Sequence, residues 1–362
     1  MTLVVVVAVG GPFLLSLVLT YVVRAWARKI GFLDHPAAHK QHAAPVALGG
    51  GVAIIASIAL PLLAGTAAAW LYRREATPPA WLPGILAAHH QGIATKFPSI
   101  LSILGCAAML HVVGLIDDRR PLGPWLKLGV QVTVALVTAG PMGIRAVEAL
   151  PAGLSIAITV VWIVLVTNAF NFLDNMDGLS AGVGAIAAGI FALSAAAAGQ
   201  IFVPVMAWVI VGALVGFLYF NFQPASVFMG DAGSLVIGYL MSTLTILTTF
   251  YDPRQDLSPL GVLVPVLVLA VPMYDVLSVM IHRLRLGQNP MVGDRRHFSH
   301  RLVQRGMTPR GAVLTIYLAT AATGLPAVVL PRVDSVAAGL LMLQCVCVVA
   351  MIAILEHAGA KR

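Results

Sequence analysis

The chain has 362 residues, of which 59% are hydrophobic and only 10% are charged, and its mean hydropathy is +0.94. Soluble globular domains carry roughly 25% charged residues, so this composition excludes a water-exposed globule. The formal net charge of +8 is then better explained by basic loops on one side of a membrane than by binding to nucleic acid.

Apolar segments of membrane-spanning length recur along the whole chain. The hydrocarbon core of a bilayer is about 30 Å thick and takes about 17–25 helical residues, and Gly and Pro are tolerated within such helices. We therefore predict an all-α polytopic membrane protein with about eleven transmembrane helices in a single integral membrane domain, residues 1–362. The predicted helices are 3–23, 50–71, 99–116, 125–141, 152–172, 179–198, 201–219, 233–250, 259–281, 312–330 and 336–355.

The first of these segments is predicted to be a membrane helix and not a cleaved signal peptide, because Met1–Thr20 lacks a basic region before its apolar run. Cys106, Cys345 and Cys347 all lie within apolar segments, without the spacing of a metal site or of a disulfide framework. We assign the three cysteines to packing, and we expect the last two segments to serve packing only.

The distribution of basic residues predicts the orientation of the chain in the membrane. Eleven crossings place the two termini on opposite sides, and an outside N-terminus leaves most of the 22 Lys and Arg residues on the cytoplasmic side. This arrangement agrees with the positive-inside rule, so the C-terminus is predicted to be cytoplasmic. The polar motifs of the chain then all fall on the cytoplasmic face, although the segments were defined from hydropathy alone.

The first polar motifs flank the second and third segments. Lys40 precedes the second segment, in a run that also contains Asp34, and its ammonium group is a candidate for neutralising a phosphate. Asp117 and Asp118 stand side by side at the inner end of the third segment. Two adjacent carboxylates repel each other and favour a divalent cation, a basic partner or a shared proton. A solvated helix end is an equally good interpretation of this pair taken alone.

Amides and carboxylates recur at helical spacing near the end of the fifth segment. Asn168, Asn171, Asp174 and Asp177 follow one another at intervals of three residues, which predicts one polar stripe along an otherwise apolar helix. Polar groups of this kind are costly within a membrane and usually functional. A hydrogen-bonded seam between helices is the alternative, and two carboxylates in the stripe make that alternative less favourable.

A glycine-rich turn, GDAGS at residues 230–234, opens the eighth segment. Its carboxylate, Asp231, either caps the helix or binds a metal ion beside backbone N–H groups that favour phosphate. Asn221 precedes this turn in the same polar cluster. The cluster is therefore a second candidate for binding metal and phosphate.

A long basic loop follows the ninth segment and ends in two histidines. Arg295 is suited to bidentate phosphate binding, while His297 and His300 can donate to phosphate or carry protons. A positive-inside loop in contact with anionic lipid is the alternative, and we accept it for Arg305 and Arg310. Zinc is not expected, because no Cys or HExxH spacing accompanies these histidines.

Together these clusters predict a metal-dependent site at the cytoplasmic surface of the membrane. Carboxylates are hard ligands that select Mg²⁺, with Mn²⁺ as the alternative. Basic groups beside a hard metal ion indicate a phosphate or diphosphate substrate, and a site at the bilayer surface indicates that one substrate is a lipid. Phosphoryl transfer depends mainly on positioning and charge neutralisation, which these residues can supply.

Taken in order, the motifs resemble the polyprenyl-phosphate N-acetylhexosamine-1-phosphate transferase family (glycosyltransferase family 4). The resemblance extends from Asp34 to about Arg310. The motifs that carry it are the early D-x-P…K-x-H…P…GG run, the Asp117–Asp118 pair with Lys127 and Gln131 after it, N-x-x-N-x-x-D-x-x-D-G, F-N…P-A…F-M-G-D-x-G-S, and D-R-x-H-x-x-H-R-L.

The resemblance implies an enzyme, a Mg²⁺-dependent phosphoglycosyltransferase that moves a sugar-1-phosphate from a UDP-sugar to a polyprenyl phosphate and releases UMP. It implies that Asp117 and Asp118 are the catalytic pair and that Asp231 is the principal Mg²⁺ ligand. The substrate-binding residues that it implies are Lys40, Lys127, Asn168, Asn171, Asp174, Asp177, Asn221, Arg295, His297 and His300.

Within the family, the early run and the late motif resemble the branch that starts O-antigen, common-antigen or teichoic-acid synthesis. The muramoyl-pentapeptide branch, by contrast, carries three consecutive His. UDP-N-acetylglucosamine and undecaprenyl phosphate are the implied substrates, with UDP-N-acetylfucosamine and UDP-N-acetylquinovosamine as alternative donors. The chain departs from the family pattern at two positions: Ser299 replaces the middle His of H-x-H-H, and Asn175 stands where the family usually has Gly.

The resemblance also implies a multi-pass protein of the bacterial inner membrane whose active site faces the cytoplasm, and it leaves a homodimer open. Direct attack by the lipid phosphate, with Asp117 taking a proton, and a two-step route through an aspartyl-phosphate both agree with the motifs. A transporter is the main alternative of another class, because intramembrane carboxylates also mark ion pathways. A membrane scaffold with degenerate motifs is a third.

Overall fold

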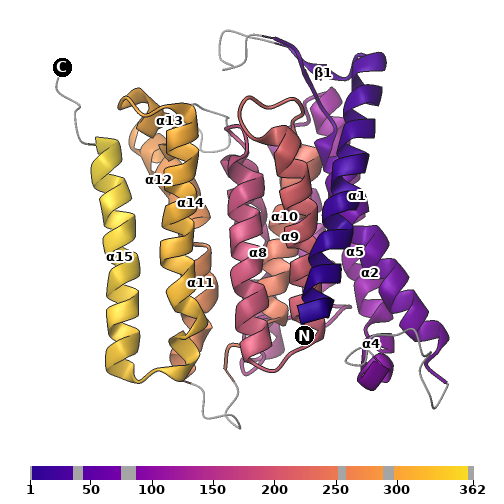
Figure 1. Ribbon diagram of the computed structural model, residues 1–362. Helices are drawn as coiled ribbons and strands as arrows, with labels where there is room; N and C mark the ends of the chain where they lie inside the picture. The colour runs from indigo at the N-terminus through magenta and orange to yellow at the C-terminus, as the bar shows by residue number, and fades with distance from the viewer. Residues whose placement is uncertain (1, 36–43, 75–86, 252–257, 288–296, 358–362) are drawn as a thin grey trace.

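The computed structural model is a bundle of α-helices that run between two ends of the molecule (Figure 1). It describes the chain apart from residues 1, 36–43, 75–86, 252–257, 288–296 and 358–362. The elements are α1 (Thr2–Lys29), β1 (Leu33–Asp34), β2 (Val46–Ala47), α2 (Gly50–Leu71), α4 (His90–Ala94), α5 (Phe97–Arg119), α6 (Pro124–Ala139), α7 (Ala152–Leu173), α8 (Leu179–Ala197), α9 (Phe202–Asn221), α10 (Asp231–Leu247), η1 (Pro259–Leu263), α11 (Val264–Val268), α12 (Ala270–Arg285), α13 (Phe298–Gln304), α14 (Pro309–Gly324), η2 (Leu325–Val328), η3 (Leu330–Arg332) and α15 (Ser335–His357).

Each predicted apolar segment corresponds to helix in the structure. Within the described residues, eight helices are long and apolar enough to cross a membrane, and α6 and α10 are shorter apolar helices of 16 and 17 residues. The segment predicted at 259–281 is not one helix, because Pro259–Val268 and Ala270–Arg285 meet at 66°. Pro272 has no amide hydrogen and its ring clashes with the carbonyl four residues earlier, so the helix breaks there. The count of eleven crossings stays a prediction.

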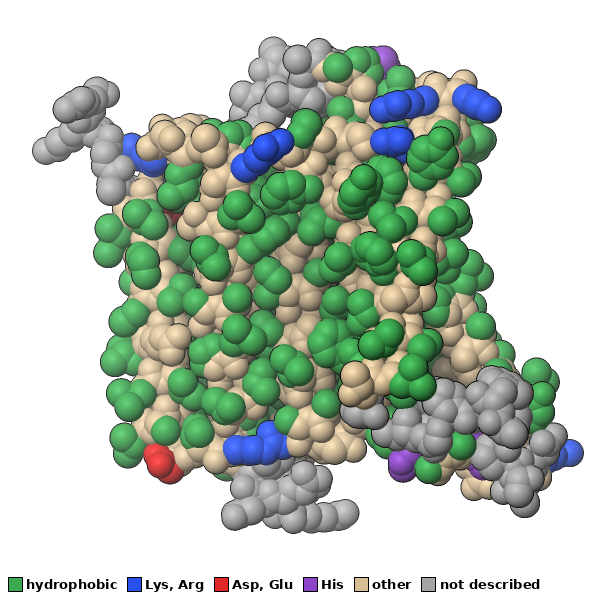
Figure 2. All heavy atoms as spheres, viewed as in Figure 1, with side chains coloured by type: hydrophobic (Ala, Val, Ile, Leu, Met, Phe, Trp, Pro, Cys, Tyr) green, Lys and Arg blue, Asp and Glu red, His purple; other side chains and the backbone are tan. Residues whose placement is uncertain are grey.

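On the face that Figure 2 shows, a broad belt of hydrophobic side chains covers the middle of the molecule, and the charged side chains lie near its two ends. Leu14, Val161, Leu318 and Leu340, from four different helices, are all mostly exposed. Soluble proteins rarely expose apolar patches of more than a few hundred Å², so the belt faces hydrocarbon and the protein is a multi-pass membrane protein. In Figure 1, α1 begins at the lower end of the bundle and α15 finishes at the upper end, as an odd number of crossings requires.

Helix α10 is the most enclosed part of the bundle, and its N-terminal end carries the polar site. All of its residues from Ala232 to Thr245 are buried, and it packs against α2, α5 and α7. Small residues permit this close packing, as in other membrane bundles. A Cβ atom on Gly238, for example, would lie 2.6 Å from the Cα of Thr167 in α7. The start of α10 is therefore held in a fixed relation to the ends of its neighbours.

Candidate active site

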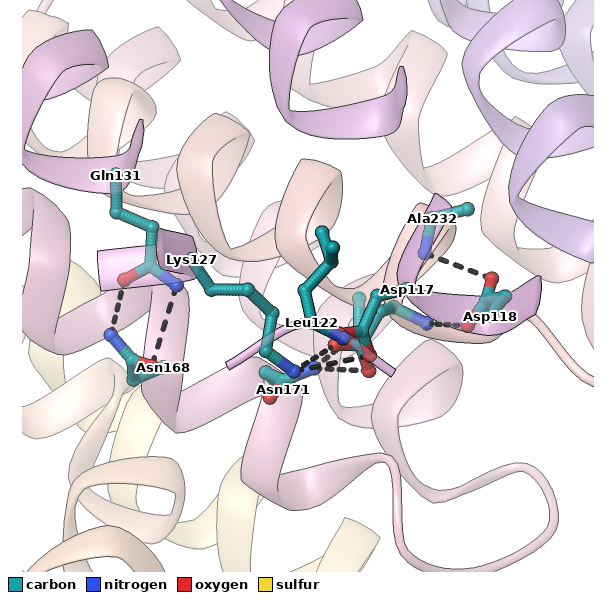
Figure 3. A network of polar contacts seen from close by, with 10 residues as sticks. Asp117, Asp118, Leu122, Lys127, Gln131, Asn168, Asn171 and Ala232 are labelled. Carbon is teal, nitrogen blue, oxygen red and sulfur yellow. Dashed lines mark hydrogen bonds and ion pairs between the residues drawn. The ribbon is translucent and has the colours of Figure 1, made fainter. Parts of the chain in front are cut away.

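The C-terminal ends of α5 and α7 and the N-terminal ends of α6 and α10 meet at one end of the bundle, where they bring four polar side chains together (Figure 3). The Lys127 ammonium lies 2.8 Å from Asp231 Oδ2 and 3.2 Å from Asp117 Oδ2. Asn171 Nδ2 donates to Asp231 Oδ1 at 2.9 Å and to Ser234 Oγ at 3.0 Å. The structure thus gathers residues from motifs that lie far apart in the sequence.

Asp118 holds the first turn of α10 and does not face Lys127. Its Oδ1 accepts a hydrogen bond from the Asp231 N–H at 2.8 Å, and its Oδ2 accepts one from the Ala232 N–H at 3.3 Å. A carboxylate in this place satisfies the free N–H groups of a helix start and interacts favourably with the helix dipole. Asp118 is therefore a positioning residue for Asp231, whereas Asp117 is the member of the pair that contacts Lys127.

Glycine residues allow the backbones of α5 and α10 to come this close. Gly230 has a φ of 66°, and a Cβ atom on it would lie 2.3 Å from Asp118 Oδ2. A Cβ atom on Gly114 would lie 2.4 Å from the Ala232 nitrogen. Real Cβ atoms do not approach other heavy atoms this closely, and glycine adopts a positive φ without strain. The contact between Asp118 and the start of α10 thus depends on glycine on both sides.

Asp117 is fixed through both of its oxygen atoms. Oδ1 accepts a hydrogen bond from the Leu122 N–H at 2.7 Å, and Oδ2 accepts one from Lys127. The side chain of Asp117 is 15% exposed, and those of Lys127 and Asp231 are each 23% exposed. These three charged groups are therefore held in place and remain accessible to a substrate.

The polar stripe predicted at the end of the fifth segment is wrong beyond its second member. Helix α7 ends at Leu173, and the residues after it form a turn that leads to Gly178, whose φ is 77°, and then into α8. Asp174 and Asp177 lie in this turn, where Asp177 Oδ2 accepts a hydrogen bond from the Ala225 N–H at 2.9 Å. Asp, Asn and Gly favour turns, and here they override the helical spacing.

The charge of Asp174 is disfavoured by its surroundings. Burial raises the pKa of its carboxyl well above the ordinary value, and the negative charges of Asp231, Asp118 and Asp177 raise it further. Carboxylates that oppose one another in this way are stabilised by a nearby cation. The turn after α7 therefore adds to a local excess of negative charge at the start of α10.

The chemistry of the donor set fits a hard divalent cation. Asp117, Asp174 and Asp231 offer carboxylate oxygens and Asn171 offers an amide oxygen, which are donors that Mg²⁺ prefers. In the described part of the chain, however, no three His, Cys, Asp or Glu side chains lie close enough to hold a metal ion. The Lys127 ammonium lies between two of the carboxylates instead. A metal ion on Asp231 would therefore displace Lys127 towards a new partner.

Asn168 and Asn221, both predicted to bind substrate, make contacts within the protein. Asn168 exchanges hydrogen bonds with Gln131, which joins α7 to α6 (Figure 3). Asn221 is buried, accepts a hydrogen bond from the Gly178 N–H at 3.1 Å and donates to the Val227 carbonyl at 2.9 Å. These contacts fix the helix ends around the site, and substrate contact by either residue stays a prediction.

The late histidine motif lies at the start of α13, beside the end of α7. His297 is buried, and its Nδ1 lies 2.8 Å from Asp275 Oδ2, while Asp275 Oδ1 accepts a hydrogen bond from the Phe298 N–H at 3.0 Å. His300 is half-buried, and its ring centroid lies 6.3 Å from that of His297. Asp275 was not among the predicted residues, and its signal in the sequence is a lone carboxylate in an apolar segment. Lys40 and Arg295, which were also predicted to bind substrate, lie outside the described residues.

Ser299 and Asn175, the two departures from the family pattern, contact each other. Ser299 Oγ donates to Asn175 Oδ1 at 2.6 Å, and Asn175 Nδ2 donates to the Phe172 carbonyl at 2.6 Å. Ser299 is fully buried, so its side chain faces the protein and not the open site. The pair ties the start of α13 to the turn after α7, and the two departures form one matched contact.

The C-terminal helix α15 reaches the late motif through Glu356, which lies just beyond the predicted apolar segment. Glu356 Oε2 accepts hydrogen bonds from Arg301 Nη2 at 2.8 Å and from Arg301 Nε at 3.1 Å, and its Oε1 accepts one from the Tyr274 hydroxyl at 2.5 Å. The Glu356 side chain is only 2% exposed. The expectation that the last two segments serve packing only is therefore wrong for α15, which holds α13 by a buried ion pair.

Comparison with known proteins agrees with this geometry. The family model for glycosyl transferase family 4 matches residues 100–249, a range that includes Asp117, Lys127, Asn171 and Asp231. A probable undecaprenyl-phosphate N-acetylglucosaminyl 1-phosphate transferase from Bacillus subtilis is 31% identical to the chain, over 87% of the chain and 81% of its own length. The chain belongs to glycosyl transferase family 4.

Other relatives place this family 4 member in the branch that its motifs resemble. A decaprenyl-phosphate N-acetylglucosaminephosphotransferase from Mycolicibacterium smegmatis is 32% identical over 84% of the chain and 78% of its own length. The undecaprenyl-phosphate alpha-N-acetylglucosaminyl 1-phosphate transferase of Escherichia coli K12 is 25% identical over 85% of the chain and 79% of its own length. The family and the branch predicted from the motifs are thus confirmed.

Removal of the Glu356 charge should destabilise the protein. In Glu356→Gln, the Arg301 guanidinium loses its buried counter-charge, and breaking a buried ion pair costs about 3–5 kcal/mol. We expect a clear fall in the melting temperature, which is measured in detergent from the change in tryptophan fluorescence on heating. Glu148→Gln, at an exposed position, is the matched control and should melt like the wild type. Equal melting of both variants would contradict the assigned role of Glu356.

The contact between Ser299 and Asn175 should appear as a coupling energy. Ser299→Ala, Asn175→Ala and the double variant form a double-mutant cycle, in which residues that contact each other are not additive. We expect a coupling of about 1 kcal/mol in the free energy of unfolding, as for one neutral hydrogen bond. Additive effects of the two substitutions on the free energy of unfolding would show that the pair does not join the start of α13 to the turn after α7.

Proposed function

We propose that the chain transfers N-acetylglucosamine-1-phosphate from UDP-N-acetylglucosamine to a polyprenyl phosphate, undecaprenyl phosphate in the first instance, and releases UMP. The observation that carries the proposal is the Asp117–Lys127–Asp231 network at one end of a membrane bundle. The names of the relatives, which are polyprenyl-phosphate N-acetylglucosamine-1-phosphate transferases, support both substrates. UDP-N-acetylfucosamine and UDP-N-acetylquinovosamine are the alternative donors.

The reaction would be the first membrane step of a surface polysaccharide, in the bacterial inner membrane with the site facing the cytoplasm. Basic residues support this orientation, because α1 ends in Arg28 and Lys29 and α5 ends at Arg119, with Arg120 directly after it, at the same end of the bundle as the site. The positive-inside rule assigns such an end to the cytoplasm, where a UDP-sugar is accessible.

The charged groups of the site divide the work of a phosphoryl transfer. Asp231 would hold Mg²⁺, which when bound neutralises negative charge on the diphosphate of the donor. Lys127 exchanges its carboxylate partners for a phosphate oxygen, and Asn171 keeps the Asp231 carboxylate in one orientation through its hydrogen bond. Asp117 accepts the proton of the lipid phosphate where that phosphate carries one.

The bond changes follow from this arrangement. An oxygen of the lipid phosphate attacks the phosphorus that bears the sugar and forms a new P–O bond. The bond from that phosphorus to the oxygen that bridges it to the uridine-linked phosphate breaks, and UMP leaves with the electron pair. A two-step route would place the same phosphoryl group first on Asp117, and a labelled covalent adduct on Asp117 distinguishes it from direct transfer.

The late motif is suited to hold the donor from its other side. His300 is the less buried of the two histidines, and we assign it to the diphosphate of the donor. His297 is fixed by Asp275 and positions the start of α13. The Ser299–Asn175 contact and the Glu356–Arg301 ion pair then keep this motif in register with the turn after α7.

Release of UMP tests the proposed reaction. The purified protein should release UMP from UDP-N-acetylglucosamine only when both undecaprenyl phosphate and Mg²⁺ are present, and EDTA should stop it. Asp231→Asn, which removes the carboxylate charge, should lower the rate by on the order of 10²-fold or more. No release from any UDP-N-acetylhexosamine, with the protein folded, would reject the transferase.

The two neighbouring aspartates should fail in different ways. Asp117→Asn removes a charge at the proposed reaction centre and should lower kcat on the order of 10²-fold, with only a small fall in the melting temperature, because its carboxyl group is partly exposed and water can replace part of the lost contacts. Asp118→Asn turns an amide N–H₂ towards one of the two backbone N–H groups, and an unsatisfied group costs about 1–3 kcal/mol. That variant should therefore show a lowered melting temperature. The same stability loss in both variants would contradict this division of roles.

A further inference from the structure

A groove of about 560 Å³ runs along the side of the bundle between α1, α2 and α5, next to the paired strands β1 and β2. Its walls are apolar and include Val23 from α1, Val52 from α2 and Leu115 from α5. Trp26 and Val112 line it too and are mostly exposed on the outer surface of the bundle. The groove therefore opens onto the hydrophobic belt, where lipid chains surround the protein.

The polar end of the groove is cationic. Arg119 and Arg120 line this end, and both are exposed. The Arg119 guanidinium lies over the Phe32 ring, 5.2 Å from its centroid. Among the described residues, neither arginine side chain has a carboxylate partner within ion-pair distance. Arg28 and Lys29 add to the positive charge at the same end of α1. An apolar channel that ends at two guanidinium groups matches a ligand with a hydrocarbon chain and a phosphate.

This groove is separate from the reaction centre. Val112, Ile116 and Arg119 recur at helical spacing on one face of α5, and all three line the groove. Asp117 precedes Arg119 by two residues, so it projects roughly 160° away around the helix axis, towards Lys127. Helix α5 therefore has two working faces, one towards the carboxylate network and one towards the groove.

We propose that the groove binds one anionic glycerophospholipid of the surrounding bilayer, with its phosphate on Arg119 and Arg120 and one acyl chain along the apolar walls. The chain itself gains little free energy by leaving the bilayer, because lipid tails are as apolar as the side chains they would contact. The choice among lipids therefore depends on the charged headgroup, since each nearby basic residue adds favourable electrostatic free energy to the binding of an anionic lipid. A neutral lipid fills the same volume without this gain.

A lipid in this place would brace the helices that support the site. It would contact α1, α5 and the residues that flank the paired strands, Phe32 and Leu48, at the end where α5 carries Asp117 and Asp118. The inference concerns a resident lipid and does not depend on the transfer reaction, so it stands or falls independently of the proposed activity.

Native mass spectrometry of the full-length protein released from nanodiscs tests the proposal. With palmitoyl-oleoyl phosphatidylglycerol, the wild type should retain one tightly bound lipid, and with palmitoyl-oleoyl phosphatidylcholine it should retain none at this site. Arg119→Gln/Arg120→Gln should weaken retention of phosphatidylglycerol about 30-fold, the effect of two basic residues near a membrane surface. Arg73→Gln/Arg74→Gln, at the opposite end of the bundle, is the matched control and should retain the lipid.

A second variant tests the apolar part of the groove. Val112→Trp keeps both arginines and places an indole ring in the channel, so it should also lose the retained lipid. Each variant is first checked for a wild-type-like melting temperature in a neutral detergent. Equal retention by the arginine double variant and its control would overturn the proposal, and so would retention by Val112→Trp. Displacement of phosphatidylglycerol by one equivalent of undecaprenyl phosphate would also overturn it, because the groove would then belong to the acceptor.

Discussion

The two hydrogen bonds that Asp118 accepts at the start of α10 are the contact on which the rest of the site depends. Backbone N–H groups at a helix start need hydrogen-bond partners, and the residues of α10 that follow Asp231 are buried. Asp118 meets this need from α5, and the glycines on both sides allow the approach. Because α10 is buried from Ala232 to Thr245, its fixed start sets the position of Asp231 and, through Asp231, the contacts of Lys127 and Asn171.

Five of the acidic residues at and around the site fall into two groups with different environments. Asp118, Asp275 and Glu356 each bind backbone N–H groups, a histidine or an arginine within the protein, and these contacts leave them little capacity for a substrate. Asp117 and Asp231 remain partly exposed and share one counter-charge, the Lys127 ammonium. Buried, paired carboxylates fix geometry, whereas exposed ones that share a cation can exchange it for a metal ion or a phosphate. The fold thus separates the positioning of the site from its chemistry.

Hydropathy predicted the helices because a helix that crosses the bilayer requires an apolar run of fixed length. The order of these runs also predicted that the polar motifs lie at one end, since each crossing places the next loop on the opposite side. The end of α7 could not be predicted in this way, since a three-residue spacing is compatible with a helix until Gly178 and its neighbours form a turn. Asp275 and Glu356 were missed because their partners are chosen by tertiary contacts. The Ser299–Asn175 pair joins residues 124 positions apart, and neither residue alone signals that contact.

The close contact between α5 and α10 determines how the lateral surface can influence the site. Gly114 lies against the backbone of Ala232 with no room for a side chain, so a rotation or shift of α5 acts directly on the first turn of α10. The opposite face of α5 lines the groove. A ligand there would act on the positions of Asp117 and Asp231 through a rigid helix, because packed helices move as units and do not deform continuously. Coupling of this kind needs no flexible loop between the lipid and the site.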